Sequence, residues 1–281
     1  MLKHFFVAIF LTIGFWVATT TTGYAQLRQN SEIGLWVGTS LYNGDLGKNI
    51  KNIRPAIGGI YRFTLNDYIA LRGGLAYTQL HGDDAYAQNA PFQTARNLRF
   101  DSHLWEASGQ IELHFLKFVA GSHKNYFSPY LTTGLTVFHF KPTAVAASDD
   151  ERYNLQDLGT EGQHNDYSGH KPYKLWQMAI PVGGGFKYWI RGPWTLFAEL
   201  TYRATFTDYI DDVSTTYVNS AFLGDYAPAI ELADRSPEVG MSPPIGEENR
   251  QRGSTTDKDG YFMFGVGLTY TIFSNKCPRS K

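Results

Sequence analysis

The chain has 281 residues, a formal net charge of −1, and 43% hydrophobic and 15% aromatic residues, but only one cysteine. The near balance of acidic and basic residues, without a basic stripe, argues against a nucleic-acid partner. A single cysteine excludes both an intramolecular disulfide and a metal site built on several thiolates.

The N-terminus has the features of a secretory signal peptide. A short basic start precedes an apolar run at residues 5–18, and the small residues Gly23 and Ala25 suit a signal peptidase. We predict that residues 1–25 are removed and that residues 26–281 form one mature domain. A membrane anchor is the alternative, but the run is shorter than the roughly 20 residues of a membrane helix. Since no later segment reaches that length, a membrane-embedded form of this chain has to be a closed β-barrel.

Alternation of apolar and polar side chains predicts eight long strands. Successive side chains of a strand point to opposite faces, and a tilted strand crosses a bilayer with about 9–11 residues. The pattern is clearest near the C-terminus, where alternate residues from Phe262 to Ile272 are all apolar and those between them are mostly small or mildly polar. The predicted strands are residues 31–42, 54–65, 68–80, 102–118, 127–140, 176–190, 194–206 and 260–273.

The connections between these strands alternate between short and long. The short ones are residues 66–67, 120–126 and 191–193, and the long ones are residues 43–53, 81–101, 141–175 and 207–259. Outer-membrane barrels have short periplasmic turns and longer extracellular loops, whereas a soluble sandwich has no reason to sort its loops in this way. We therefore predict an all-β fold, an eight-stranded antiparallel up-and-down transmembrane β-barrel. We expect it to lie in the outer membrane of a Gram-negative bacterium, with long extracellular loops and both termini in the periplasm.

Charged residues fall on the strand faces that this barrel turns inward, although the strand at 127–140 is ambiguous. A charge on the lipid face costs about 2–4 kcal/mol for Arg or Lys at the midplane, and buried charges persist when they are paired. Eight strands leave an interior that side chains just fill. We predict a paired network that plugs the barrel; a selective ion path is the alternative and needs a wider lumen. The predicted members are Arg62, Arg72, Glu106, Glu112, Lys187, Glu199 and Arg203.

Three carboxylates follow the seventh predicted strand. Asp208, Asp211 and Asp212 could together ligate a hard cation such as calcium. They lack the spaced Asp/Asn and Gly pattern that makes a calcium loop specific. We interpret them instead as caps and hydrogen-bond acceptors of the loop backbone.

Other reactive residues give no specific motif. His164 and His170, with Asp166 and Tyr167, match no standard metal spacing and are interpreted as polar loop residues. No Gly-x-Ser-x-Gly or comparable motif activates a nucleophile. We therefore predict no catalytic residue, no cofactor and no metal, hence a non-enzymatic protein. Cys277 follows the last strand and is either a thiol that pairs with a partner or a simple free cysteine.

The segment from Arg203 to Val218, with the strand from Trp194 that precedes it, resembles the PorG-like family of Bacteroidota outer-membrane barrels, which is associated with the type IX secretion system. The glycine-rich last strand, the tail at 277–278 and the stretch at 42–45 are similar too. The residues that match the family motif, with a role that we propose only as structural, are Asp208, Tyr209, Asp211, Asp212 and Val213.

The resemblance implies a non-enzymatic outer-membrane anchor. Its partners are expected to be outer-membrane lipid and periplasmic components of the secretion machinery, which it contacts through its periplasmic turns or its tail. The alternative is a surface barrel whose outer loops bind a ligand, a surface polymer or a host molecule. Loss of cargo secretion on gene disruption supports the first hypothesis, and loss of binding on loop deletion supports the second.

Overall fold

The computed structural model describes residues 30–47, 49–87, 90–165, 167, 170–224 and 226–273. The predicted signal peptide at residues 1–25, Asp166 and Cys277 lie outside these residues. Across the described ranges, no helix is both long enough and apolar enough to span a membrane.

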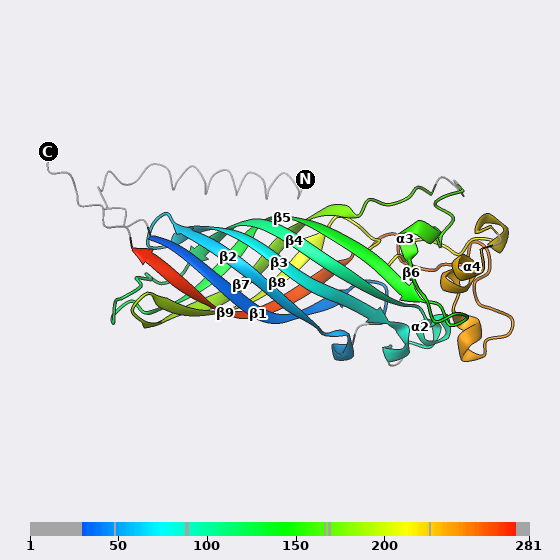
Figure 1. The fold of residues 1–281 in the computed structure, drawn as a ribbon, viewed down its shortest axis with the longest axis horizontal. Coiled ribbons are helices and arrows are strands. Elements are labelled where there is room, and N and C mark those ends of the chain that lie inside the picture. The colour runs from blue at the N-terminus through cyan, green and yellow to red at the C-terminus, as the bar shows by residue number, and fades with distance from the viewer. Residues whose placement is uncertain are drawn as a thin grey trace, which may run out of the picture.

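Eight long strands form one closed antiparallel barrel (Figure 1). Neighbours in the chain are neighbours in the sheet, β5 pairs with both β4 and β7, and the first strand closes the barrel against the last. The strands are β1 (Asn30–Asn43), β2 (Arg54–Thr64), β3 (Ile69–Asp83), β4 (Arg99–His114), β5 (Phe127–Val145), β7 (Trp176–Arg191), β8 (Trp194–Thr205) and β9 (Gly260–Phe273). The predicted eight-stranded antiparallel up-and-down barrel is confirmed.

The predicted strand ends are wrong mainly in the β4–β5 hairpin. This hairpin continues past the predicted ends to the pair Asp101 and Thr143. A further short strand, β6 (Arg152–Asn154), then pairs with the end of β5. At the other end of the hairpin, β4 stops at His114 and not at residue 118, because the pairing with β5 ends at Tyr130.

Apolar side chains cover the outside of the barrel. Leu35 and Leu75 are 73% and 69% exposed, and each of the eight long strands carries further exposed apolar residues. Exposed aromatic residues stand at both ends of this belt, such as Trp105 and Trp176 near the long loops and Trp194 near the short turns. An apolar belt flanked by aromatic residues suits contact with lipid hydrocarbon and its two interfaces.

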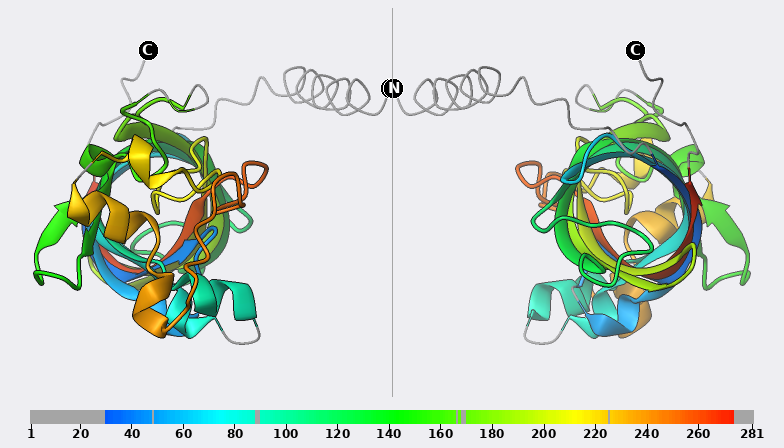
Figure 2. Two further views of the ribbon diagram at one scale, coloured as in Figure 1. Left: turned by 90° about the vertical axis from the view of Figure 1, so that its right-hand side faces the viewer. Right: turned by 90° about the vertical axis from the view of Figure 1, so that its left-hand side faces the viewer.

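The four long connections gather at one end of the barrel, the long-loop end, and the short turns lie at the opposite, short-turn end (Figure 1). The long connections contain only short elements, and the segment after β8 lies over part of the barrel mouth (left view of Figure 2). The described part of residues 207–259 forms no single regular element. The short elements are η1 (Ile50–Asn52), η2 (Asp84–Tyr86), α2 (Pro91–Arg96), α3 (Leu155–Leu158), η4 (Ser220–Phe222), α4 (Ala227–Ala233) and η5 (Ser236–Val239).

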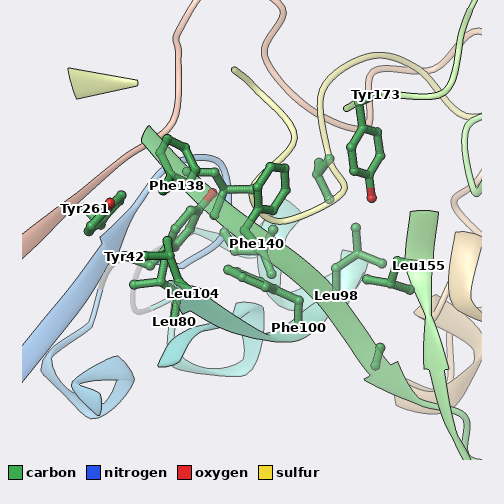
Figure 3. Close-up of a cluster of buried hydrophobic side chains, with 14 of the residues drawn as sticks. Tyr42, Leu80, Leu98, Phe100, Leu104, Phe138, Phe140, Leu155, Tyr173 and Tyr261 are labelled. Carbon is green, nitrogen blue, oxygen red and sulfur yellow. The ribbon is translucent and has the colours of Figure 1, made fainter. Parts of the chain in front are cut away.

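The main buried apolar cluster lies where the barrel meets these connections (Figure 3). Phe138 and Phe140 project inward from β5, and Tyr42 and Tyr261 project inward from β1 and β9. Tyr173, which precedes β7, stacks on Phe140 with ring centroids 6.1 Å apart. The long connections therefore pack onto the barrel and bury part of its rim.

Candidate functional site in the barrel lumen and the loop cap

The lumen near the short-turn end holds a cluster of ion pairs. Arg62 of β2 donates hydrogen bonds to Glu32 of β1 at 2.5 Å and to Glu112 of β4 at 2.6 Å. Lys187 of β7 donates to the other oxygen of Glu32 at 2.7 Å. His114 lies 3.4 Å from Glu112. These contacts tie four strands that are not all neighbours in the sheet.

A second set of ion pairs crosses the lumen nearer to the long-loop end. Arg72 of β3 pairs with Glu199 of β8 on the opposite wall, and its guanidinium also lies 3.1 Å from Glu112. Arg203 of β8 pairs with Glu106 of β4 at 2.7 Å. Tyr261 donates a hydrogen bond to Glu106 at 2.7 Å, so that carboxylate is bound from two sides.

The luminal network is neutral and closely packed. Its four cations face four carboxylates, and the side chains are almost completely buried. The cavity beside Arg72 and Arg203 has a volume of only about 30 Å³, the space of one or two water molecules. A lumen filled in this way offers no continuous path for ions.

All seven residues of the predicted network lie in the lumen, and each is paired there. Sequence analysis missed Glu32, which accepts hydrogen bonds from two of the cations. Its position carries a usable signal, because Glu32 shares the inward face of β1 with Trp36 and Ser40, whereas Ile33 points outward. What no local pattern indicates is that its partners come from β2 and β7.

The described residues of 44–53, 84–98, 146–175 and 206–259 form a unit that we call the loop cap. Two buried arginines hold its segments together. Arg252 donates to Glu161 at 3.0 Å and to the carbonyl of Asp212 at 2.6 Å. Arg96 donates to Asp84 at 2.7 Å and to the carbonyl of Asp45 at 3.0 Å. Each arginine thus links two or more connections that are far apart in the sequence.

The family-motif residues lie in the centre of the loop cap. Asp208 accepts a hydrogen bond from Ser214 at 2.6 Å, and Asp212 accepts one from Tyr173 at 2.7 Å. Tyr209 stacks on Tyr173 with ring centroids 4.7 Å apart. The remaining motif residues are Asp211, which accepts from the backbone N–H of Val213 at 3.0 Å, and Val213 itself, which is buried in the apolar cluster.

The candidate metal ligands that lie in the described part of the chain contact other groups of the protein. No group of three or more His, Cys, Asp or Glu residues there is placed to hold an ion. The ring nitrogens of His164 and His170 lie 2.9 Å from the backbone carbonyls of Gln156 and Glu161. These histidines therefore support the loop backbone.

One tyrosine hydroxyl of β1 lies between two carboxyl groups of the loop cap. The Tyr42 oxygen is 2.5 Å from Asp211 and 2.9 Å from Asp259, and it accepts the N–H of Asp45 at 2.9 Å. A phenol has one proton to donate and two lone pairs to accept with. Tyr42 donates to one carboxylate, so the other carboxyl group has to carry a proton and donate to Tyr42. The pair Asp211 and Asp259 therefore holds one proton.

The surroundings of these carboxyl groups favour protonation. Burial, reinforced by the charge of Asp259, raises the pKa of Asp211 well above its ordinary value. Burial likewise raises the pKa of Asp259 well above its ordinary value. Burial also raises the pKa of Asp208 and that of Asp212 to about 6. Tyr42 and Asp259 are 217 positions apart, so no local pattern in the sequence indicates this site.

Comparison with known proteins gives a family and several distant structural similarities. Residues 3–224 match the family model described as "Domain of unknown function (DUF6089)". No curated protein matches the chain significantly. Among solved structures, the chain is similar to Ail of Yersinia pestis (12% identity, 87% of this chain and 99% of that chain, TM-score 0.42). It is also similar to OprG of Pseudomonas aeruginosa (9%, 88% and 97%, 0.40) and to neisserial surface protein A (12%, 86% and 96%, 0.37). Because these scores and identities are low, the barrel fold rests on the strand pairing and not on the similarities.

Replacing Glu112 with Gln should strongly destabilise the barrel. The change removes the negative charge that faces both Arg62 and Arg72, and an uncompensated buried charge costs about 3–5 kcal/mol. Urea-induced unfolding in detergent micelles measures the free energy of unfolding. The isosteric control Glu247→Gln, at an exposed loop position, should change it by less than about 0.5 kcal/mol. Equal stability of the two variants would contradict the proposed role of the ion pairs.

The loop cap should open more readily as the pH rises. The folded-state pKa values of Asp208 and Asp212 are raised from 3.8 to about 6, and those of Asp211 and Asp259 lie higher than their ordinary values. Their stabilisation is therefore fully present below about pH 4 and is lost as the pH rises through 6 and beyond. Hydrogen exchange of the Ile210 and Val213 amides, corrected for intrinsic exchange, measures this opening.

Asp211→Asn should reduce this pH dependence to the part that comes from Asp208 and Asp212. An asparagine accepts the Val213 N–H and donates to Tyr42, whose proton then goes to Asp259, so every hydrogen bond survives without the shared proton. The control Asp257→Asn, at an exposed position, should keep the wild-type pH profile. An unchanged profile in Asp211→Asn would argue against a proton shared by the two carboxyl groups.

Proposed function

The chain belongs to the DUF6089 family of domains of unknown function, and we propose that it is a non-enzymatic anchor in the outer membrane of a Gram-negative bacterium. In this proposal residues 1–25 are a cleaved signal peptide and residues 26–281 form the barrel domain. The apolar belt with aromatic residues at both ends supports a position in the membrane.

The orientation follows from the loops. Asn30 pairs with Phe273, so both ends of the described barrel lie at the short-turn end. In outer-membrane barrels the short turns are periplasmic and the longer loops are extracellular. We therefore place both termini in the periplasm and the loop cap on the cell surface.

The observation that carries the anchor proposal is the filled lumen. Arg72–Glu199 and Arg203–Glu106 connect opposite walls, and the cavity beside them has room for only one or two water molecules. A barrel whose interior is held by ion pairs is stiff and closed. Such a body fits the task of holding other proteins at the membrane better than the task of conducting solutes.

The proposed partners are periplasmic components of a protein secretion system. This part of the proposal rests on the resemblance of the motif residues to PorG-like barrels of the type IX system. The motif side chains hydrogen-bond, stack and pack within the loop cap, which supports a structural role for them in folding the cap. Contacts with periplasmic partners then fall to the short turns, such as the one at residues 115–126.

A second candidate function is ligand binding by the loop cap. A cavity of about 490 Å³ opens between α4, η5 and the residues around Tyr217. Leu223 and Ile230 give it an apolar part, and Asp234 and Glu248 give it a negative part. A cavity of this size and mixed character is typical of small-molecule or side-chain binding.

Gene disruption separates the two functions. If the protein anchors secretion components, disruption should reduce cargo secretion severalfold and reduce the recovery of periplasmic components with the outer membrane. Expression of the wild-type chain, or of a variant with the cavity filled by Ala233→Trp, should restore both. Unchanged secretion after disruption would contradict the anchor function in secretion. Restoration by the wild type but not by Ala233→Trp, with equal amounts in the membrane, would favour ligand binding.

A further inference from the structure

A row of aromatic side chains crosses the outer face of the barrel near the long-loop end. Tyr77 of β3, Trp105 of β4, His139 of β5 and Trp176 of β7 are successive partners in the sheet register. The ring centroids of Tyr77 and Trp105 are 4.5 Å apart, and those of His139 and Trp176 are 5.1 Å apart. Aromatic residues with a polar edge are typical of the membrane interface.

A hollow lies directly below this row, toward the middle of the barrel. Its volume is about 450 Å³, and the register places Leu75, Ala107 and Val137 side by side in its floor. Trp105 and Trp176 also line it. The small side chain of Ala107 lies between the larger Leu75 and Val137 in the register. The hollow is an apolar recess open to the lipid side.

Basic residues stand above the row, one step closer to the loops. In the register, His103 of β4 lies opposite Lys141 of β5, and both side chains are exposed. Arg152 of β6 reaches over the same face and donates to Asp101 at 3.2 Å and to Thr143 at 3.0 Å. Its side chain remains 51% exposed. The order from the loops to the midplane is therefore basic residues, aromatic row and apolar hollow.

We propose that this face binds a phosphate-bearing lipid of the outer leaflet, with an acyl chain in the hollow and the phosphate at Lys141 and Arg152. Arg and Lys are the side chains that recognise phosphate, and an acyl chain matches the apolar recess. The inference rests on the proposed membrane position and orientation of the barrel. The larger hollow of about 810 Å³ at β1, β8 and β9 reaches Trp194 beside the short turn at residues 192–193, so in the proposed orientation it faces the inner leaflet.

Quenching of tryptophan fluorescence by brominated acyl chains tests the proposal. Trp189→Phe and Trp194→Phe leave Trp105 and Trp176 as the lipid-facing tryptophans, because Trp36 points into the lumen. This protein is refolded in phosphatidylcholine vesicles that contain either brominated phosphatidylglycerol or brominated phosphatidylcholine. The relative quenching gives the preference of the site for the anionic lipid. We expect quenching to show a preference of about fivefold for phosphatidylglycerol over phosphatidylcholine, because the attraction of one basic residue to an anionic headgroup corresponds to about this factor.

Two charge variants in the same background locate the preference. Lys141→Gln with Arg152→Gln should abolish it, and Lys141→Gln alone, which leaves the contacts of Arg152 intact, should reduce it. Lys117→Gln, at the short-turn end beside Asp67, removes the same charge elsewhere and should leave it unchanged. Quenching by brominated phosphatidylcholine in each variant confirms that the barrel is folded in the bilayer.

The possible results are distinct. Equal quenching by the two lipids, or a preference that survives Lys141→Gln with Arg152→Gln, would overturn the lipid site and leave the membrane position intact. Absence of quenching by either lipid in a folded protein would overturn the proposed membrane position itself. A preference that Lys117→Gln also removes would show only a general attraction to anionic vesicles and would overturn the site.

Discussion

Every charge that faces the lumen of this barrel has to find its counter-charge inside, because the outer side of the wall is apolar and the interior excludes most water. Four cations and four carboxylates meet this condition by pairing around and across the lumen. Leaving one of them unpaired costs several kcal/mol, so the pairs fix the relative positions of strands on opposite walls. The arrangement that makes the interior electrically neutral also fills it. The closed lumen and the stiffness that suits an anchor are thus consequences of one electrostatic constraint.

The loop cap meets the same constraint by different means. Arg252 and Arg96 neutralise some of its buried carboxylates and bind carbonyls of other segments. Asp211 and Asp259 face each other across the Tyr42 hydroxyl, and a shared proton takes the place of a cation. The stability of the cap therefore depends on pH through these carboxyl groups. Its stability is coupled to the barrel through Tyr42, which belongs to β1.

The sequence predicts the barrel well because each strand repeats the same local rule. Alternation from Phe262 to Ile272 and the charges at positions such as Arg62 and Glu199 decide which face points inward without knowledge of the partners. The extension of the β4–β5 hairpin is not predicted by this rule. Pro142 lies opposite Ser102 in the sheet, but a proline cannot donate a ladder hydrogen bond and therefore gives no strand signal in the sequence. The alternation rule gives no information about the loop cap, because contacts such as that of Tyr42 with Asp259 join segments that are distant in the sequence and show no periodicity.

The central claim is that the ion pairs close the lumen, and the electrical conductance of the folded barrel in planar lipid bilayers tests it most directly. The refolded wild-type protein should give no discrete conductance steps above those of the bare bilayer, at any moderate voltage and salt concentration. Reproducible steps whose size rises with salt concentration, obtained from protein shown to be folded, would contradict the account. They would mean that a continuous water-filled path runs past Arg72 and Arg203.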